Sequence, residues 1–186
     1  MKPELMVAGA VALVVVVWAI ATHNRLVALR QHLRESWADI DVELKRRWEL
    51  IPNLVETVKG YAQYERETLE RVIALRNSAM AAPDRAAAHA TAESALLLGL
   101  KQVFALAEGY PTLKADTHFR TLQKELAITE DRIAAARRFY NGNVRDLNRV
   151  REQFPSSIIA TRMAIPEAEY FELSSDAERV VPRVEV

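Results

Sequence analysis

The sequence predicts an all-α protein, with an N-terminal transmembrane helix followed by an up-down antiparallel helical bundle. Three observations support this. The N-terminal region contains a long run without charged residues, and apolar residues recur at helical spacing over most of the chain after it. The composition, with five Gly, seven Pro and abundant Ala, Leu, Glu and Arg, also favours helices. The 186 residues suffice for one packed domain and a short extension.

The predicted membrane anchor is the uncharged run Leu5–Ala21, within a first segment of residues 1–22. As a helix this run spans roughly 26 Å at ~1.5 Å per residue, near the lower limit for crossing a bilayer. Trp18 lies where an interfacial aromatic residue is expected. A buried core helix and a cleaved signal peptide ending at Ala19-Ile20-Ala21 are the alternatives. We favour a retained anchor, because the run is longer than a usual signal-peptide core.

The predicted bundle covers residues 23–155. Apolar residues recur at steps of three and four through this region, and they form a nearly unbroken stripe in its last helix. Gly109 and Pro111 are expected to end the helix before it. Asp116 is the expected N-cap of the last helix, and Phe154-Pro155 its end.

Pro52 decides how many helices the bundle has. Proline lacks a backbone N–H, so it is tolerated in the first turn of a helix and costly in the interior. A break at Ile51-Pro52 gives four segments of similar length, which pair well in a four-helix bundle. The alternative is three helices with a long, kinked first helix, because no Gly or Asn cluster precedes Pro52 and the apolar spacing continues across it. We prefer the break.

Residues 156–186 are expected to form an irregular C-terminal arm, because this stretch and the residue before it contain three Pro and show weak periodicity. Its apolar residues are candidates for docking on the bundle, namely Ile158, Ile159, Tyr170 and Phe171. The last ten or so residues are expected to be mobile.

No motif for catalysis, cofactor binding or metal binding was found. The sequence lacks His-Glu-x-x-His, Gly-x-Ser-x-Gly, the phosphate-binding loop and Gly-x-Gly-x-x-Gly, and no Glu has a His three residues later. We therefore expect no enzymatic activity and no cofactor. The chain has no Cys, which excludes disulfides, Cys-type zinc sites and an acylated Cys.

The charge pattern argues against nucleic-acid binding. The 25 Lys and Arg residues balance 25 Asp and Glu residues, so no long-range attraction to nucleic acid or to an anionic membrane is expected. The Arg residues between Arg132 and Arg151 alternate with acidic residues and have no aromatic face beside them. They are best interpreted as a salt-bridged helix surface.

Two clusters form a candidate interaction surface. The three consecutive cations Lys45 to Arg47 could bind lipid headgroups or an acidic partner. They could also be a solvated helix end whose charges complement the helix dipole. The stretch "RRFYNGN" places Tyr140 on the core stripe beside mediocre helix formers, which favours either a local packing adjustment or a docking point. The candidate residues are Lys45, Arg46, Arg47, Trp48, Asn53, Tyr140 and Asn141.

Several long motifs resemble one family. These are "NRLVALRQHLRESWADIDVELKRRWELIPNLVETVKGYA", "YPTLKADTHFRTLQKEL", "TEDRIAAARRFYN", and "FPSSIIA" with "EYFE". They resemble motifs of the LemA family of bacterial membrane proteins and follow one another in the same order. The resemblance covers nearly all of the chain after the anchor. The resemblance implies an anchored helical bundle without an established enzymatic activity. Two residues depart from the family pattern. At Trp48 many relatives have an acidic residue or His, so the resemblance implies a more apolar surface here. At Gly142 many relatives have a residue other than glycine.

The expected function is a non-enzymatic, membrane-tethered scaffold or protein-interaction module of the bacterial envelope. The alternative, which the resemblance suggests, is an accessory or regulatory subunit of a membrane protease or of a magnetosome-like membrane-remodelling machinery. The expected partners are the lipid bilayer, unknown envelope proteins and a second copy of the chain.

The expected location is the bacterial cytoplasmic membrane, crossed once. Arg25, Arg30 and Arg34 follow the run, whereas only Lys2 precedes it. Because Lys and Arg in short flanks are retained in the cytoplasm, the bundle is expected on the cytoplasmic side.

Overall fold

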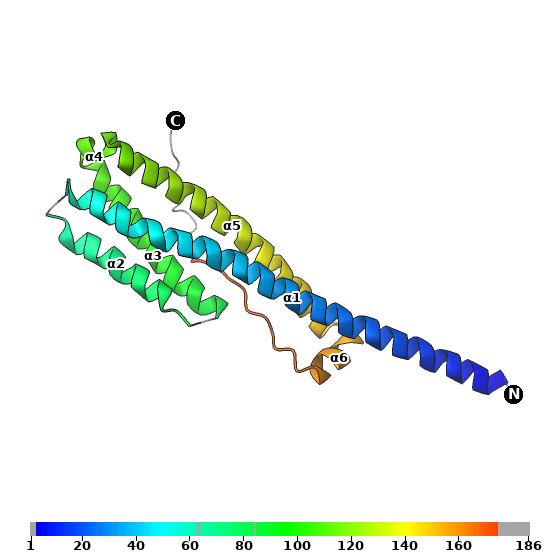
Figure 1. Ribbon diagram of the computed structural model, residues 1–186. Coiled ribbons are helices and arrows are strands. Elements are labelled where there is room, and N and C mark those ends of the chain that lie inside the picture. Colours follow the sequence, from blue (N-terminus) through cyan, green and yellow to red (C-terminus); the bar gives the residue numbers. More distant parts are fainter. Residues whose placement is uncertain (1–2, 63, 84, 175–186) are drawn as a thin grey trace. The chain divides into compact units, whose positions relative to one another are not determined.

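The computed structural model describes residues 3–62, 64–83 and 85–174, and within them it contains helices and no strand. The helices are α1 (Pro3–Lys59), α2 (Arg66–Met80), α3 (Ala86–Glu108), α4 (Pro111–Ala115), α5 (Thr117–Glu152) and α6 (Ser156–Arg162) (Figure 1). The predicted all-α class is therefore confirmed. The chain divides into two compact units, Met1–Trp37 with Tyr140–Ala168, and Ala38–Phe139 with Glu169–Val186.

The unit Ala38–Phe139 with Glu169–Val186 is a four-helix bundle. The last part of α1, α2, α3 and the first part of α5 lie side by side (Figure 1). Its core consists of apolar residues at the helical spacing seen in the sequence, including Ile40, Leu44, Leu54, Val72, Leu96, Val103, Phe119, Leu126 and Ile133. At Gly99, α3 approaches α2 closely, because an added Cβ there would lie 2.7 Å from Leu75 Cδ1.

The helix ends agree with the local signals in the sequence. Asp116 Oδ1 accepts a hydrogen bond of 2.9 Å from the Phe119 N–H, which confirms Asp116 as the N-cap of α5. The Tyr61 hydroxyl donates to Asp116 Oδ2 at 2.7 Å, and these two hydrogen bonds lower the pKa of Asp116 below its ordinary value. Helix α3 ends directly before Gly109, and α5 ends two residues before Phe154-Pro155.

The predicted break at Ile51-Pro52 is wrong, because α1 continues through Pro52 to Lys59. The missing N–H of proline leaves the carbonyl four residues earlier, that of Trp48, without its usual helical partner. Arg76 Nε, on α2, donates a hydrogen bond of 2.6 Å to this oxygen. Ile51 is fully buried, so the apolar stripe remains in phase across the proline. The chain turns instead after Gly60, before α2.

The unit Met1–Trp37 with Tyr140–Ala168 has a smaller core of its own. Leu26 of α1, Leu147 and Val150 of α5, Ala160 of α6 and Ile165 pack together there. The rings of Trp37 and Tyr140 also contact, with centroids 5.4 Å apart. Asn148 Oδ1 accepts from the Ala168 N–H at 2.9 Å, and its Nδ2 donates to the Ala168 carbonyl at 3.0 Å. These bonds hold the chain that follows α6 against α5.

The expectation of irregular structure from residue 156 is wrong for its first part, where α6 forms. Ser156 Oγ lies 2.7 Å from the Val150 carbonyl and 2.8 Å from that of Gln153, which ties the start of α6 to the end of α5. Phe171 is fully buried, as expected of a docked residue, but Ile158 is 58% exposed. The residues expected to be mobile lie outside the described part of the chain.

Candidate functional site

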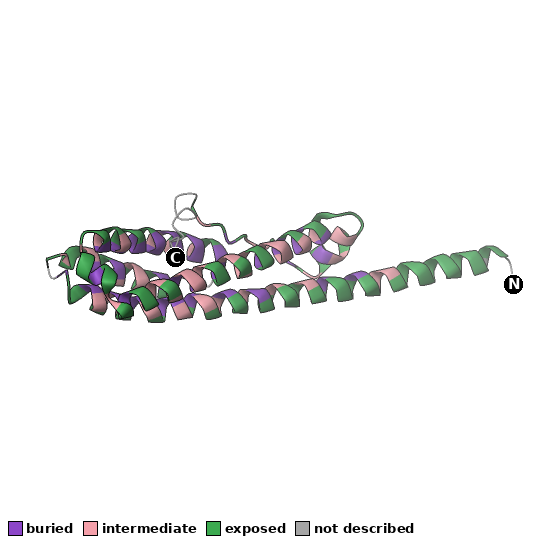
Figure 2. Cartoon of the chain, turned by 90° about the horizontal axis from the view of Figure 1, so that it is seen from above, coloured by how far each residue is buried: buried purple, intermediate pink, exposed green. Residues whose placement is uncertain are grey.

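Among the described residues, two helices, α1 and α3, are long and apolar enough to cross a membrane. Half of the apolar window in α3 is buried within the bundle, which makes α3 a core helix. The window in α1 is almost entirely exposed, with Leu13 and Val14 65% and 67% exposed (Figure 2). Apolar side chains exposed in this way are suited to lipid. The N-terminal part of α1 is therefore compatible with a single membrane span.

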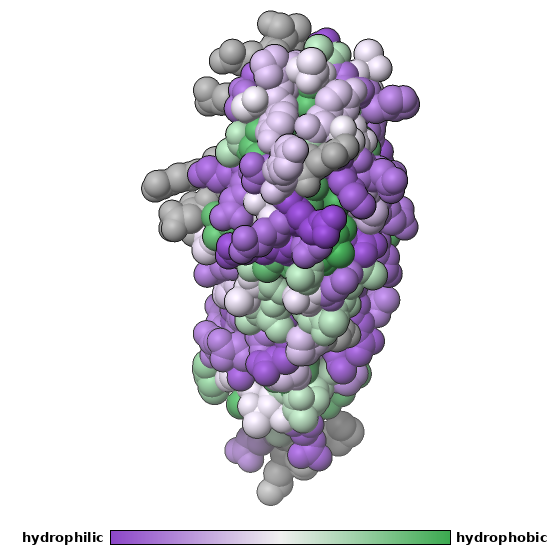
Figure 3. Space-filling view, turned by 90° about the vertical axis from the view of Figure 1, so that its left-hand side faces the viewer, coloured by the Kyte–Doolittle hydropathy of each residue, from purple (hydrophilic) through white to green (hydrophobic). Residues whose placement is uncertain are grey.

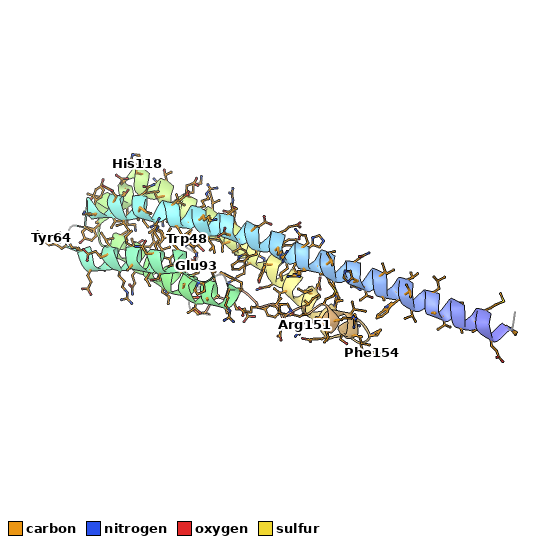
Figure 4. All side chains as sticks on the ribbon, turned by 60° about the horizontal axis from the view of Figure 1, so that its bottom comes forward. Trp48, Tyr64, Glu93, His118, Arg151 and Phe154 are labelled. Carbon is orange, nitrogen blue, oxygen red and sulfur yellow. The ribbon has the colours of Figure 1, made fainter. Side chains whose placement is uncertain are left out.

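A buried cluster of charged side chains connects three helices of the bundle. Arg47 of α1 donates from Nη1 to both carboxylate oxygens of Glu130 on α5, at 2.7 and 2.9 Å, and from Nη2 to Glu93 of α3. Trp48 Nε1 donates to the other oxygen of Glu93 at 2.9 Å, and Figure 4 shows Trp48 and Glu93 close together. The side chains of Arg47 and Glu93 are each only 1% exposed.

The cluster holds one cation and two carboxylates. Burial raises the pKa of the Glu93 carboxyl, although Arg47 and the Trp48 N–H act in the opposite direction. Burial alone would lower the pKa of Arg47, but the charges of Glu130 and Glu93 outweigh it and raise that pKa. Arg47 therefore stays charged, and Glu93 is the member that binds a proton more readily than an ordinary glutamate.

The predicted surface around Lys45, Arg46, Arg47 and Trp48 is only partly a surface. Arg47 and Trp48 lie in the interior, so the expectations that Arg47 binds a partner and that Trp48 makes the surface more apolar are wrong. Both residues are buried because α1 continues through this region, so that residue 47 lies mid-helix and faces the core. Lys45 and Arg46 are paired within the chain, with Asp41 at 2.5 Å and Glu125 at 2.7 Å.

A groove that sequence reasoning missed lies at the turn between α1 and α2. It has a volume of about 870 Å³ and is lined by Val55, Glu56, Lys59, Gly60, Ala62, Tyr64, Arg66, Leu69, Glu70 and Ile73. Tyr64 is 98% exposed, and Figure 4 shows it at the tip of the turn. Figure 3 faces the left-hand end of Figure 1, where this turn lies, and shows apolar patches bordered by polar residues. The two tyrosines of "GYAQYE" were the available sequence signal.

A family model for LemA matches residues 36–186, which is most of the chain and includes the whole bundle. The chain belongs to the LemA family. No match to a curated protein was found. The family match begins after the apolar run of α1, so the evidence for a membrane span comes from α1 itself.

The remaining predicted residues of this LemA-family chain differ in exposure. Tyr140 is buried beside Trp37, as its place on the core stripe predicted, and Asn141 is half-buried. Asn53 is exposed on α1. Apart from its own stretch of helix, a Cβ added at Gly142 would meet no atom of the described residues within 4 Å, so no close approach by them requires glycine there. The part of the chain that the structure describes contains no group of three His, Cys, Asp or Glu residues suited to a metal ion.

Proposed function

We propose that this LemA-family protein is a non-enzymatic, membrane-tethered interaction module that presents the groove between α1 and α2 to a helix of another envelope protein. One observation carries the proposal. The same unbroken helix, α1, carries the exposed apolar run at its N-terminal end and one wall of the groove at its C-terminal end. Both features therefore belong to one helical segment, residues 3–59.

The composition of the groove favours an amphipathic helix as the occupant. Leu69 is buried in it, Val55 and Ile73 are half-buried, and the charged residues Lys59 and Glu70 are exposed around them. An apolar floor with charges of both signs at the rim suits a helix with one apolar face and a polar remainder.

The buried cluster supports a structural rather than a chemical role for the interior. Arg47 and Glu93 are almost completely buried, and both bond within a cluster that includes the partly buried Glu130. They fix α1 against α3 and α5, while Arg76 bonds α2 to the Trp48 carbonyl of α1. Rigid walls reduce the entropy lost when a partner binds.

Site-specific photo-crosslinking in membranes containing the full-length protein tests the proposal. A photoreactive residue in place of Tyr64 should give a discrete adduct, whereas the same residue at Met80, which is exposed on α2 outside the groove, should not. Ile73→Glu should abolish the Tyr64 adduct while the helical circular dichroism is unchanged. Equal adducts at both positions, or none at Tyr64, would contradict the groove as the binding site.

The identity of the protein crosslinked at Tyr64 distinguishes a scaffold from an accessory subunit. Several partners, or a second copy of the chain, favour a scaffold. A single partner with protease activity that changes when the protein is removed favours an accessory subunit. Anchoring is tested independently by washing membranes with alkaline carbonate, which should leave the protein in the pellet. Quantitative release would show that residues 5–21 do not cross the bilayer.

A further inference from the structure

We propose that the corner between α5 and α6 is a second membrane contact. Phe154 and Ile158 insert into the interfacial region of the same bilayer that α1 crosses, and Arg162 faces the lipid phosphates. The inference rests on the proposed anchoring of α1, and it adds a lipid-binding surface that α1 alone does not provide. All of the residues that carry it belong to the unit Met1–Trp37 with Tyr140–Ala168.

The first observation is the exposure of two large apolar side chains at this corner. Phe154 is 79% exposed and Ile158 is 58% exposed, although Ala160 and Ile159 of the same segment pack into the core of the unit. Exposed apolar side chains that project from a packed corner resemble the apolar face of an interfacial segment. The corner therefore has an inner side that docks on α1 and α5 and an outer side that none of the described elements covers.

The second observation places the corner at the end of the apolar run. Helix α6 lies beside α1, and the two helices line a cavity of about 460 Å³ formed by Ala19, Ile20, His23, Ile159, Arg162 and Met163. Ala21 is the last residue of the uncharged run, and Trp18 is only partly exposed one turn before it. An aromatic residue followed by polar ones marks the boundary between hydrocarbon and headgroups. Helix α6 is thus at the depth where α1 leaves the bilayer.

The direction of the corner agrees with this placement. Figure 4 shows Phe154 on the side of the corner nearer the N-terminal end of α1, and Arg151 farther from that end. Arg151 has Glu152 within 3.5 Å and Glu167 within 3.8 Å. The apolar residue therefore points toward the side where the lipid-facing part of α1 continues, and the paired charges lie away from it.

The third observation is the charge available at this depth. Arg25 follows the apolar run by one turn, and Arg162 lines the cavity between α6 and α1. Both are exposed, and neither forms an ion pair with another residue in the described part of the chain. The guanidinium group of arginine binds phosphate oxygens well, and cations at the membrane surface favour anionic headgroups. A bilayer is the occupant that satisfies the apolar and the cationic parts of this surface together.

The consequence is a defined orientation of the protein on the membrane. A lone transmembrane helix is free to tilt and to rotate about its axis, and interfacial anchors restrict both motions. A second contact through Phe154 and Ile158 fixes which side of α1 faces the bilayer surface.

The test uses single cysteines introduced into the Cys-free, full-length chain and labelled with an environment-sensitive fluorophore. Three positions are compared, namely Phe154, Ile20 and Phe139. Phe139 is the matched control, because it is an exposed phenylalanine on α5, the helix that ends two residues before Phe154. The labelled proteins are reconstituted into vesicles of phosphatidylcholine and phosphatidylglycerol containing a nitroxide lipid quencher.

The expected result is a blue shift and strong quenching by the nitroxide lipid at Ile20 and at Phe154, with severalfold weaker quenching at Phe139. Arg162→Gln should make quenching at Phe154 less dependent on the phosphatidylglycerol content, without changing the helical circular dichroism. Quenching at Ile20 but not at Phe154 would overturn the second contact and leave the anchor intact. Absence of quenching at Ile20 would overturn the anchor itself, and the second contact with it.

A fourth outcome concerns a protein partner. If the Phe154 label is shielded both from the nitroxide lipid and from aqueous iodide, another polypeptide covers the corner, and the proposed lipid contact is wrong.

Discussion

Arg76 is the residue that allows Pro52 to lie inside α1, and a double-mutant cycle tests this role. Proline removes the N–H that would bond the Trp48 carbonyl, and Arg76 Nε replaces that donor at 2.6 Å. Arg76→Met keeps most of the aliphatic side chain but removes the donor. It should therefore leave the carbonyl of a buried residue without a protein partner.

The expected magnitude follows from the charge of the donor. A hydrogen bond to a charged group contributes about 1.5–3 kcal/mol, so Arg76→Met should lower the free energy of unfolding by about 2 kcal/mol. Pro52→Ala introduces a new N–H four residues after Trp48 and should restore the helical bond. In the Pro52→Ala background, Arg76→Met should then cost about 1 kcal/mol or less, which corresponds to a coupling energy of about 1 kcal/mol or more between the two positions.

The assay is denaturant unfolding of the full-length protein in detergent micelles, followed by tryptophan fluorescence, because Trp48 is buried in the bundle. Arg71→Met is the matched control, since Arg71 is an exposed arginine on the same helix, α2. It should change stability by less than about 0.5 kcal/mol in both backgrounds. An equal cost of Arg76→Met with and without Pro52 would refute the interpretation that Arg76 replaces the missing N–H.

Four further predictions concern the buried cluster, Gly142 and the side of the membrane on which the bundle lies. Arg47→Met leaves Glu93 and Glu130 buried without a cation and should cost about 3–5 kcal/mol in the same assay. Because burial raises the pKa of Glu93, its contribution to stability is largest below the ordinary carboxyl value of 4.5 and is lost as pH rises through the raised value, so Glu93→Gln should weaken this decline. Gly142→Ala should stabilise the protein by up to ~1 kcal/mol, because the new methyl group meets no atom within 4 Å, and a loss of stability would contradict this. Arg66→Cys should react with an impermeant maleimide only after the cytoplasmic membrane is opened, whereas labelling in intact spheroplasts would place the bundle outside.

The features predicted correctly from the sequence depend on neighbouring residues. The membrane-compatible run, the apolar stripe through Tyr140, the cap at Asp116 and the end of α3 before Gly109 each arise within one helix or at its end. Helical spacing and capping chemistry are local, so they can be interpreted without knowing the partner helices.

The errors concern residues whose partners are distant in the sequence. The sequence favours a turn at Pro52, because its compensating donor, Arg76, lies on another helix, 28 residues from Trp48. The sequence places Arg47 on a surface, because its partners Glu93 and Glu130 follow it only after 46 and 83 residues. A cation in an apolar stripe is consistent both with a solvated end and with a buried pair, and only the positions of the facing carboxylates distinguish them.

The position of Arg47 within the stripe of α1 explains why a buried cluster is useful in this bundle. The apolar stripe repeats regularly along α1 and α5, so apolar packing alone distinguishes weakly between registers that differ by one helical turn. Moving α3 or α5 by a turn would separate Glu93 or Glu130 from Arg47 and leave a buried charge without its partner. The cost of such a charge is large even though the net stabilisation by a correctly formed pair is small. We therefore infer that the cluster selects the register of the helices rather than adding to their stability.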